Sequence, residues 1–188
     1  MTDDCVNVPA GNVRKTYGKR AGLRQSNVRS WWFSRTRLPL AILFLTALCD
    51  QISKYVIVSH WHPGAHLVVI PNFFHIVHVR NTGAAWGMFR GQTIPLAVLS
   101  ILVFAFIWWR FRHLAGGHAE RAAGLSLVCG GIVGNLIDRL FRGDVVDFLL
   151  FYYRDFQWPA FNVADSAICV GVAIFVISSF FNPEYDAE

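Results

Sequence analysis

Hydrophobic residues are concentrated in four segments of this chain, and polar connections separate them. The segments comprise residues 38–58, 93–111, 122–141 and 163–181. Each is close to the roughly 20 apolar residues with which a helix crosses the hydrocarbon core of a bilayer. The pattern therefore predicts an all-α polytopic membrane protein with four transmembrane helices.

The third segment is rich in glycine. Gly130 and Gly134 are four residues apart, a spacing that lets helix backbones approach one another closely. We therefore expect the third helix to be central in the bundle.

Two long connections, residues 59–92 and 142–162, separate the helices at one end. Within the first, residues 66–70 and 74–79 are β-branched and apolar, and Pro71, Asn72 and Phe73 separate them. Short runs of this kind around a turn are typical of a β-hairpin. We expect a small extracytoplasmic β-sheet or hairpin at the membrane surface.

Composition and charge agree with the membrane interpretation. Hydrophobic residues make up 54% and charged residues 15% of the 188 residues, which is too apolar for an ordinary soluble domain. Eight of the seventeen Lys and Arg residues lie between Arg14 and Arg37, ahead of the first apolar segment. Membrane topology explains that clustering better than nucleic-acid binding does, so no nucleic-acid partner is expected.

Basic residues also predict the orientation in the membrane. Residues 110–121 contain three arginines, whereas residues 59–92 contain Arg80 and Arg90. Because cytoplasmic loops carry the excess of Lys and Arg, both termini are predicted to be cytoplasmic and residues 59–92 and 142–162 to be outer loops. The predicted parts are a basic, flexible cytoplasmic tail (1–37), a four-helix membrane domain (38–182) and a short cytoplasmic C-terminal tail (183–188).

The N-terminal region has a second interpretation, as a cleaved signal peptide. A basic stretch, the apolar run of residues 38–48 and Cys49 are arranged as in a lipoprotein precursor. Leu48, however, occupies the position before the cysteine where a small residue is expected, and the apolar run continues to Val58. A membrane-spanning helix is therefore the favoured prediction.

Histidines cluster in the first outer loop. Five of the seven lie within nineteen residues, at His60, His62, His66, His75 and His78. The loop has no HExxH pattern and no cysteine, and the spacings match no common ligand arrangement. We expect surface or interfacial histidines and no metal site.

Two aspartates, Asp147 and Asp165, stand at the edges of apolar segments. A carboxylate beside lipid is energetically costly, so each is a functional-site hypothesis. The predicted topology brings both to the outer membrane face. Two neighbouring carboxylates share one proton and can activate a water molecule, which indicates a hydrolase.

Other polar residues accompany the third and fourth segments. Asn135, Asp138 and Arg139 lie on one helix face, and with Asn162 they are predicted to form a hydrogen-bonded shell around the site. Asp138 stands next to Arg139, so its charge is expected to be compensated, which makes it a weaker candidate for the catalytic acid.

Further polar residues belong to the first segment and the first outer loop. Asp50 and Lys54 are four residues apart, and a structural ion pair is the favoured interpretation over direct catalysis. Asn81 and Gly83 open a run of very small residues. That run is either a tight turn or a surface where an extended substrate passes close to the backbone, with Asn81 forming a hydrogen bond.

Five short motifs, taken in order, resemble those of bacterial lipoprotein signal peptidase (signal peptidase II). They are DQISK at 50–54, NTGAAW at 81–86, GGIVGNLIDR at 130–139, GDVVDF at 143–148 and FNVAD at 161–165. The likeness extends over about residues 38–182; Trp86 stands where the family often has Phe.

The resemblance implies an aspartyl endopeptidase of the bacterial cytoplasmic (inner) membrane, with Asp147 and Asp165 as catalytic residues. Such an enzyme removes the signal peptide of a prolipoprotein by cutting before its diacylglyceryl-modified cysteine. We expect no metal or organic cofactor, a monomer in contact with membrane lipid, and inhibition by globomycin-type compounds. The substrate-binding or supporting residues are then Asn81, Gly83, Asn135, Asp138, Arg139, Asn162, Asp50 and Lys54.

Two other classes of function remain open. A small proton-coupled transporter or channel also uses intramembrane carboxylates, but it predicts acids near the bilayer midplane and internal repeats. Here the acids cluster toward one face, and no inverted repeat is evident. A structural membrane adaptor leaves the costly acids unexplained.

Overall fold

The structure is a computed structural model that describes residues 13–83, 88–154 and 156–182, with side chains described from residue 37 onward. Its helices are α1 (Val13–His60), α2 (Thr93–Ala115), α3 (Ala119–Phe141) and α4 (Val163–Phe181). Its strands are β1 (His66–Ile70), β2 (Phe74–Asn81), β3 (Val145–Tyr153) and β4 (Phe156–Gln157). The chain divides into two units, Met1–Arg37 and Leu38–Glu188.

Helix α1 begins well before the predicted span. Residues 13–37 form the first part of this helix. The sequence predicts a flexible tail for the same segment. Arg and Lys, which recur in this segment, are good helix formers, and extending an existing helix costs less than nucleating a new one.

Four helices within the described residues are long and apolar enough to cross a membrane, which confirms the predicted fold class. They are residues 37–60 of α1 together with α2, α3 and α4. Helix α2 continues past the predicted end to Ala115, and α3 begins at Ala119. A tight turn joins them, because Gly116 adopts a left-handed φ of 54° and its N–H donates to the Arg112 and His113 carbonyls.

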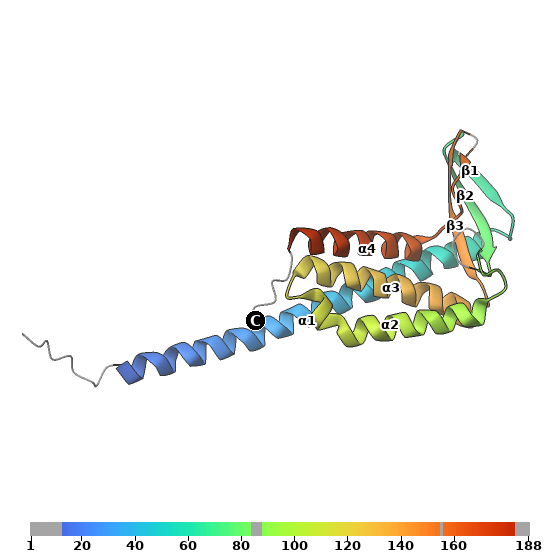
Figure 1. Cartoon of the computed structure of the whole chain (residues 1–188). Helices are drawn as coiled ribbons and strands as arrows, with labels where there is room; N and C mark the ends of the chain where they lie inside the picture. The colour runs from blue at the N-terminus through green and yellow to red at the C-terminus, as the bar shows by residue number, and fades with distance from the viewer. Residues whose placement is uncertain (1–12, 84–87, 155, 183–188) are drawn as a thin grey trace, which may run out of the picture. The chain divides into compact units, whose positions relative to one another are not determined.

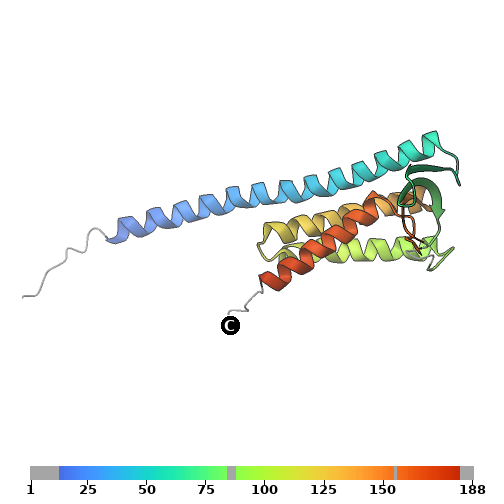
Figure 2. The same ribbon diagram turned by 90° about the horizontal axis from the view of Figure 1, so that it is seen from above.

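Helix α3 packs between its neighbours, as its glycines predicted (Figures 1 and 2). A Cβ on Gly130 would lie 2.7 Å from the Leu43 carbonyl oxygen of α1, and one on Gly124 would lie 2.7 Å from the Gly171 carbonyl oxygen of α4. The helix backbones therefore approach one another at these points. Most of α3 is buried, whereas the other three spans are largely exposed.

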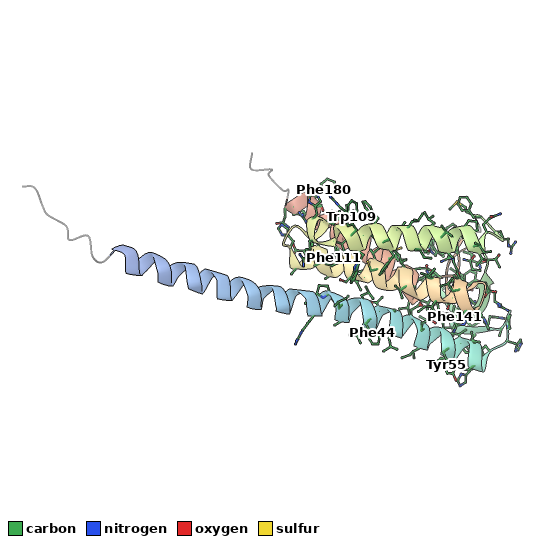
Figure 3. The ribbon with its side chains drawn as sticks, turned by 90° about the horizontal axis from the view of Figure 1, so that it is seen from below. Phe44, Tyr55, Trp109, Phe111, Phe141 and Phe180 are labelled. Carbon is green, nitrogen blue, oxygen red and sulfur yellow. The ribbon has the colours of Figure 1, made fainter. Side chains whose placement is uncertain are left out.

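The exposed faces of the spans carry large apolar side chains. Figure 3 shows Phe44 and Tyr55 on α1, Trp109 on α2 and Phe180 on α4 directed away from the bundle, and all four are exposed. A soluble domain rarely leaves so continuous an apolar surface uncovered, whereas lipid covers it at no cost.

A four-stranded antiparallel sheet in the order β1-β2-β3-β4 lies at one end of the helices (Figure 1). Strands β1 and β2 form the predicted hairpin. The sequence did not predict that residues 145–153, from the second long connection, form β3 and pair with β2 along most of its length. The sheet therefore joins the two long connections next to the start of α4.

Candidate active site

Asp147 lies on β3, opposite Val79 of β2, and it is 2% exposed. Both of its carboxylate oxygens accept hydrogen bonds from side-chain amides. Asn81 Nδ2 donates to Oδ2 at 2.9 Å, and Asn162 Nδ2 donates to Oδ1 at 2.7 Å. The sheet thus directs one acid toward the start of α4.

Asp165 lies in the first turn of α4 and belongs to a capping box with Asn162. Asn162 Oδ1 accepts from the Asp165 N–H at 3.0 Å, and Asp165 Oδ2 accepts from the Asn162 N–H at 3.2 Å. The other carboxylate oxygen accepts from Asn135 Nδ2 of α3 at 2.8 Å. Asn162 therefore contacts both aspartates, which we call the aspartate pair.

The orientation of each of these three amides is fixed by a group that can only donate. Asn81 Oδ1 accepts from the Gly83 N–H at 2.9 Å, and Asn135 Oδ1 accepts from Lys54 Nζ at 2.9 Å. Asn162 Oδ1 accepts from the Asp165 N–H. Because the oxygen of each amide must face its donor, the NH₂ group faces a carboxylate of the aspartate pair.

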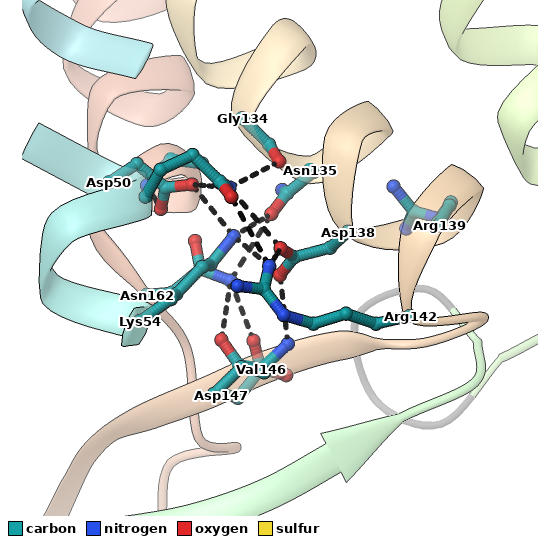
Figure 4. Close-up of polar contacts among 12 residues, drawn as sticks. Asp50, Lys54, Gly134, Asn135, Asp138, Arg139, Arg142, Val146, Asp147 and Asn162 are labelled. Carbon is teal, nitrogen blue, oxygen red and sulfur yellow. Dashed lines mark hydrogen bonds and ion pairs between the residues drawn. The ribbon is translucent and has the colours of Figure 1, made fainter. Parts of the chain in front are cut away.

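Next to Asp147, four charged residues, three of them fully buried, form a network that we call the charged cluster (Figure 4). Lys54 Nζ lies 2.8 Å from Asp50 Oδ2 and 3.0 Å from Asp138 Oδ2, and all three side chains are fully buried. Arg142 pairs with Asp138 Oδ1. The two acids and two bases balance, as a buried ionic cluster requires.

The charged cluster also fixes backbone at the site. The Val146 N–H, next to Asp147, donates to Asp138 Oδ2 at 3.1 Å. The Ala164 N–H, next to Asp165, donates to Asp50 Oδ1 at 2.9 Å. Each supporting acid therefore anchors the residue adjacent to one member of the aspartate pair.

The structure corrects the predicted partner of Asp138. Its carboxylate contacts Lys54 and Arg142, not the adjacent Arg139. Consecutive residues on a helix point in different directions, whereas residues four apart share a face. Arg139 instead donates to the Gly83 carbonyl at 3.4 Å and interacts electrostatically with both members of the aspartate pair.

Sequence reasoning missed two polar residues of the site. Arg142 stands four residues after Asp138, a spacing that signals a helical ion pair. Gln51 donates to Asp138 Oδ1 at 3.2 Å and to the Gly134 carbonyl at 3.0 Å, and accepts from Arg142 at 3.2 Å. Only its place beside Asp50 gave any sign of this role.

Burial and charge together change the acidity of Asp147. Burial, and then the neighbouring Asp165 charge, raise the pKa of the Asp147 carboxyl to about 7, although the amide hydrogen bonds and Lys54 act in the opposite direction. Asp147 therefore keeps its proton to a much higher pH than an ordinary aspartate does. Such a pair offers an acid and a base to one water molecule.

Gly83 is buried where the chain turns away from β2. A Cβ there would lie 2.5 Å from the Met88 carbonyl oxygen, so this contact requires glycine. The remainder of the NTGAAW motif, from Ala84 onward, lies outside the described residues. A substrate surface along that run stays a prediction.

Histidines of the connection between α1 and α2 contact other groups of that connection. His78 Nδ1 bonds the Trp61 carbonyl oxygen at 2.8 Å, and His66 stacks against His75. In the part of the chain that the structure describes, no group of three or more His, Cys, Asp or Glu residues is arranged to bind a metal ion.

Known proteins resemble this chain over most of its length. The sequence profile of the family described as Signal peptidase (SPase) II matches residues 42–181. A lipoprotein signal peptidase of Syntrophotalea carbinolica is 41% identical over 147 residues, which cover 77% of this chain and 91% of the relative. One of Bacillus pumilus is 40% identical over 150 residues, covering 78% and 95%. A solved structure described as a bacterial membrane enzyme has a TM-score of 0.73 and 30% identity, and the match covers 80% of this chain and 93% of that one.

Proposed function

Because the chain belongs to the signal peptidase II family, and is therefore a membrane protease that removes signal peptides from prolipoproteins, we propose that Asp147 and Asp165 perform the cleavage. The observation that carries this proposal is the shared contact of both carboxylates with Asn162. Two acids held by the side-chain amide and the backbone N–H of one residue, at the end of the membrane helices, form an aspartyl protease site that needs no metal ion or organic cofactor.

The reaction divides between the two carboxyls. Asp165 acts as the base and removes a proton from a water molecule, whose oxygen attacks the carbonyl carbon of the scissile peptide bond. Asp147 begins protonated, consistent with its raised pKa, and donates a hydrogen bond to the developing oxyanion. The carbonyl then re-forms as the carbon–nitrogen bond breaks, and Asp165 delivers the proton that it took from water to the leaving nitrogen.

The three oriented amides position the aspartate pair during this reaction. Asn81 and Asn162 direct the carboxyl plane of Asp147, and Asn135 directs Asp165. Neutral amides orient a carboxyl without removing its proton, which a contacting Lys or Arg would favour. The charged cluster supports this arrangement from below and takes no part in proton transfer.

The family and the position of the aspartate pair at the end of the spans together indicate the substrate. We propose that the enzyme cuts before the diacylglyceryl-modified cysteine of a prolipoprotein, whose lipid chains contact the exposed apolar faces of the helices. Basic residues precede the first span in the sequence and recur at 110–121, between the second and third spans, whereas the two aspartates follow the third span. Because cytoplasmic loops carry the excess of Lys and Arg, this distribution supports a site at the outer face of the bacterial cytoplasmic membrane, with both termini in the cytoplasm.

All groups named here come from one chain, so we propose that a monomer is active. Globomycin-type inhibitors would compete for the same site. A transporter requires carboxylates along a path through the membrane, whereas Asp147 lies on a strand outside the spans and Asp165 in the first turn of α4. No contact in the described residues favours that alternative.

The test is cleavage of a lipid-modified prolipoprotein peptide by the purified full-length protein. Asp147→Asn and Asp165→Asn keep the size of each side chain but remove its titrating group, and we expect each to lower kcat at least a thousandfold. Glu120→Gln, which removes an exposed carboxylate at the other end of α3, is the matched control and should retain activity. Wild-type cleavage by either aspartate variant would refute the catalytic assignment, and loss of cleavage in EDTA would refute the metal-free mechanism.

A further inference from the structure

Arg80 and Asp144 form an ion pair beside the aspartate pair. Arg80 Nη2 lies 2.8 Å from Asp144 Oδ2. Arg80 immediately precedes Asn81, which donates to Asp147, and Asp144 stands three residues before Asp147. The Arg80–Asp144 pair therefore joins the two segments that carry a catalytic acid and the amide that orients it.

The two partners differ in exposure. The Asp144 side chain is 11% exposed and that of Arg80 51%. Asp144 Oδ1 has no hydrogen-bond partner among the described residues, so the Arg80 contact is the main compensation of its charge. A nearly buried carboxylate is energetically costly without such a partner. Loss of the Arg80 contact should therefore disturb Asp144, even though Arg80 itself reaches solvent.

Neighbouring contacts fix the same stretch of backbone. Arg80 Nη2 also lies 3.4 Å from the Arg142 carbonyl oxygen, to which it donates, and Thr93 Oγ1 donates to the Gly143 carbonyl at 2.9 Å. The side chain of Arg142 contacts Asp138 of the charged cluster. Residues 142–144 are thus tied to β2, to the start of α2 and to the charged cluster.

We propose that Arg80 and Asp144 are positioning residues for the cleavage reaction. Their contact fixes the end of β2 against the start of β3, so that the Asn81 side chain stays within hydrogen-bond distance of Asp147. It also neutralises the charge of Asp144 close to the aspartate pair. This inference rests on the proposed role of Asp147 and adds two residues that do not touch substrate.

Loss of either partner should shift the pKa of Asp147 in a direction that follows from the charge left behind. The charged groups around Asp147 are Asp165 from α4, Lys54 from α1, Arg139 from α3, and Asp138, whose carboxylate bonds the Val146 N–H. Three residues along a strand correspond to about 10 Å. At that distance, and at an effective dielectric constant of about 20 to 40, one uncompensated charge shifts a pKa by about half to one unit.

Removing either partner therefore has opposite effects on the pH dependence of cleavage. Arg80→Gln leaves the negative Asp144 uncompensated and raises the alkaline limb of the kcat profile by about half to one pH unit. Asp144→Asn leaves the positive Arg80 and lowers that limb by a similar amount. The double variant Arg80→Gln/Asp144→Asn returns the limb to the wild-type pH, although its kcat stays low because the contact is lost.

The experiment measures kcat, KM and the pH profile of cleavage for these variants of the full chain. Each neutralising variant is expected to lower kcat about tenfold with KM within twofold of wild type, and Arg80→Lys should recover most of the activity and the wild-type profile. Arg154→Gln is the matched control, because it removes an exposed arginine beyond the far end of β3, and it should leave the profile unchanged.

Shifts of the same sign in both single variants, or wild-type kcat in both, would overturn the inference. If Asp144→Asn fails to fold, the Arg80→Gln and Arg80→Lys comparison decides, because Arg80 reaches solvent. An inactive Asp147→Asn together with unperturbed Arg80 and Asp144 variants leaves the proposed function intact and rejects the positioning role alone. An active Asp147→Asn rejects both.

Discussion

Asn162 has two separable roles, which a pair of substitutions can distinguish. Its side chain is fully buried. Its oxygen accepts from the Asp165 N–H as the N-cap of α4, while its NH₂ group donates to Asp147 Oδ1. Serine keeps an oxygen that caps a helix but has no second donor on the opposite side, whereas alanine keeps neither.

The magnitudes of the two roles differ. Replacing a good N-cap residue with alanine costs about 1 kcal/mol, and serine avoids most of that cost. A hydrogen bond to a charged acceptor contributes about 1.5 to 3 kcal/mol. Because this bond favours the ionised form, its loss should raise the pKa of Asp147 above its present value of about 7. The corresponding rise is about 1 to 2 units.

Two measurements separate the roles. Thermal unfolding in detergent should rank Asn162→Ser above Asn162→Ala by about 2 to 4 °C, the shift that 1 kcal/mol produces in a chain of this size. Cleavage should fall about a hundredfold in both variants, because a misplaced acid no longer reaches the reacting atoms. The alkaline limb of kcat should move upward in both. Gln157→Ala, which removes an exposed amide in β4, is the control and should match wild type.

One outcome would refute this reasoning directly. Near-wild-type kcat in Asn162→Ser, with an unchanged alkaline limb, would mean that the contact with Asp147 has no part in the reaction. Equal melting temperatures of the serine and alanine variants would instead reject the capping contribution.

Three further predictions concern the groups beneath and within the aspartate pair. The pKa of Asp147 is about 7 in the folded protein against an ordinary 3.8. Its protonation therefore stabilises the fold fully below pH 4, and this contribution is lost as pH rises through 7. Asp147→Asn should accordingly flatten the fall in melting temperature from pH 5 to pH 8. Lys54→Met leaves two buried acids short of a cation and should lower the free energy of unfolding by about 3 to 5 kcal/mol; adding Asp50→Asn should recover part of it in thermal unfolding. Gly134→Ala would set a Cβ 2.5 Å from Asp50 Oδ2, and it should lower both melting temperature and kcat; unchanged values would show that α1 can move away from α3.

The helices could be predicted from the sequence because the bilayer restricts the alternatives. A long apolar segment must satisfy its backbone internally in lipid, and a helix does so without help from the rest of the chain. Gly130 and Gly134 likewise indicated where other parts of the bundle pack closely against α3, because their four-residue spacing can be read from one segment of the sequence. Local information was sufficient for these features.

The sheet shows where local information ends. Residues 145–153 are mostly apolar and adjoin a helix, and they become a strand because β2, more than sixty residues earlier, pairs with them. The register changes between Ile76 and Val79, which determines the residue opposite Asp147. A slip of one residue would direct Asp147 to the other face, and nothing in the sequence alone fixes that register.

The site was predictable in part for an energetic reason. Asp147 and Asp165 stood out because an acid beside lipid needs an explanation. The partners of Asp138 could not be predicted in this way. The adjacent Arg139 is its obvious partner in the sequence but points to another side of the helix. Gln51 was missed because a neutral amide next to Asp50 carries no energetic cost large enough to mark it as unusual.

Asp50 and Asp138 differ from the aspartate pair in the charge of the side chains that contact them. Asp50 and Asp138 of the charged cluster each contact at least one cation. Within the described residues neither member of the aspartate pair forms an ion pair, and amides take the place of cations. A lysine or arginine in contact would favour two ionised carboxylates and remove the acid half of the reaction. Replacing Asn81 with lysine should therefore lower kcat even in a variant that folds, because the pair would lose its proton at neutral pH.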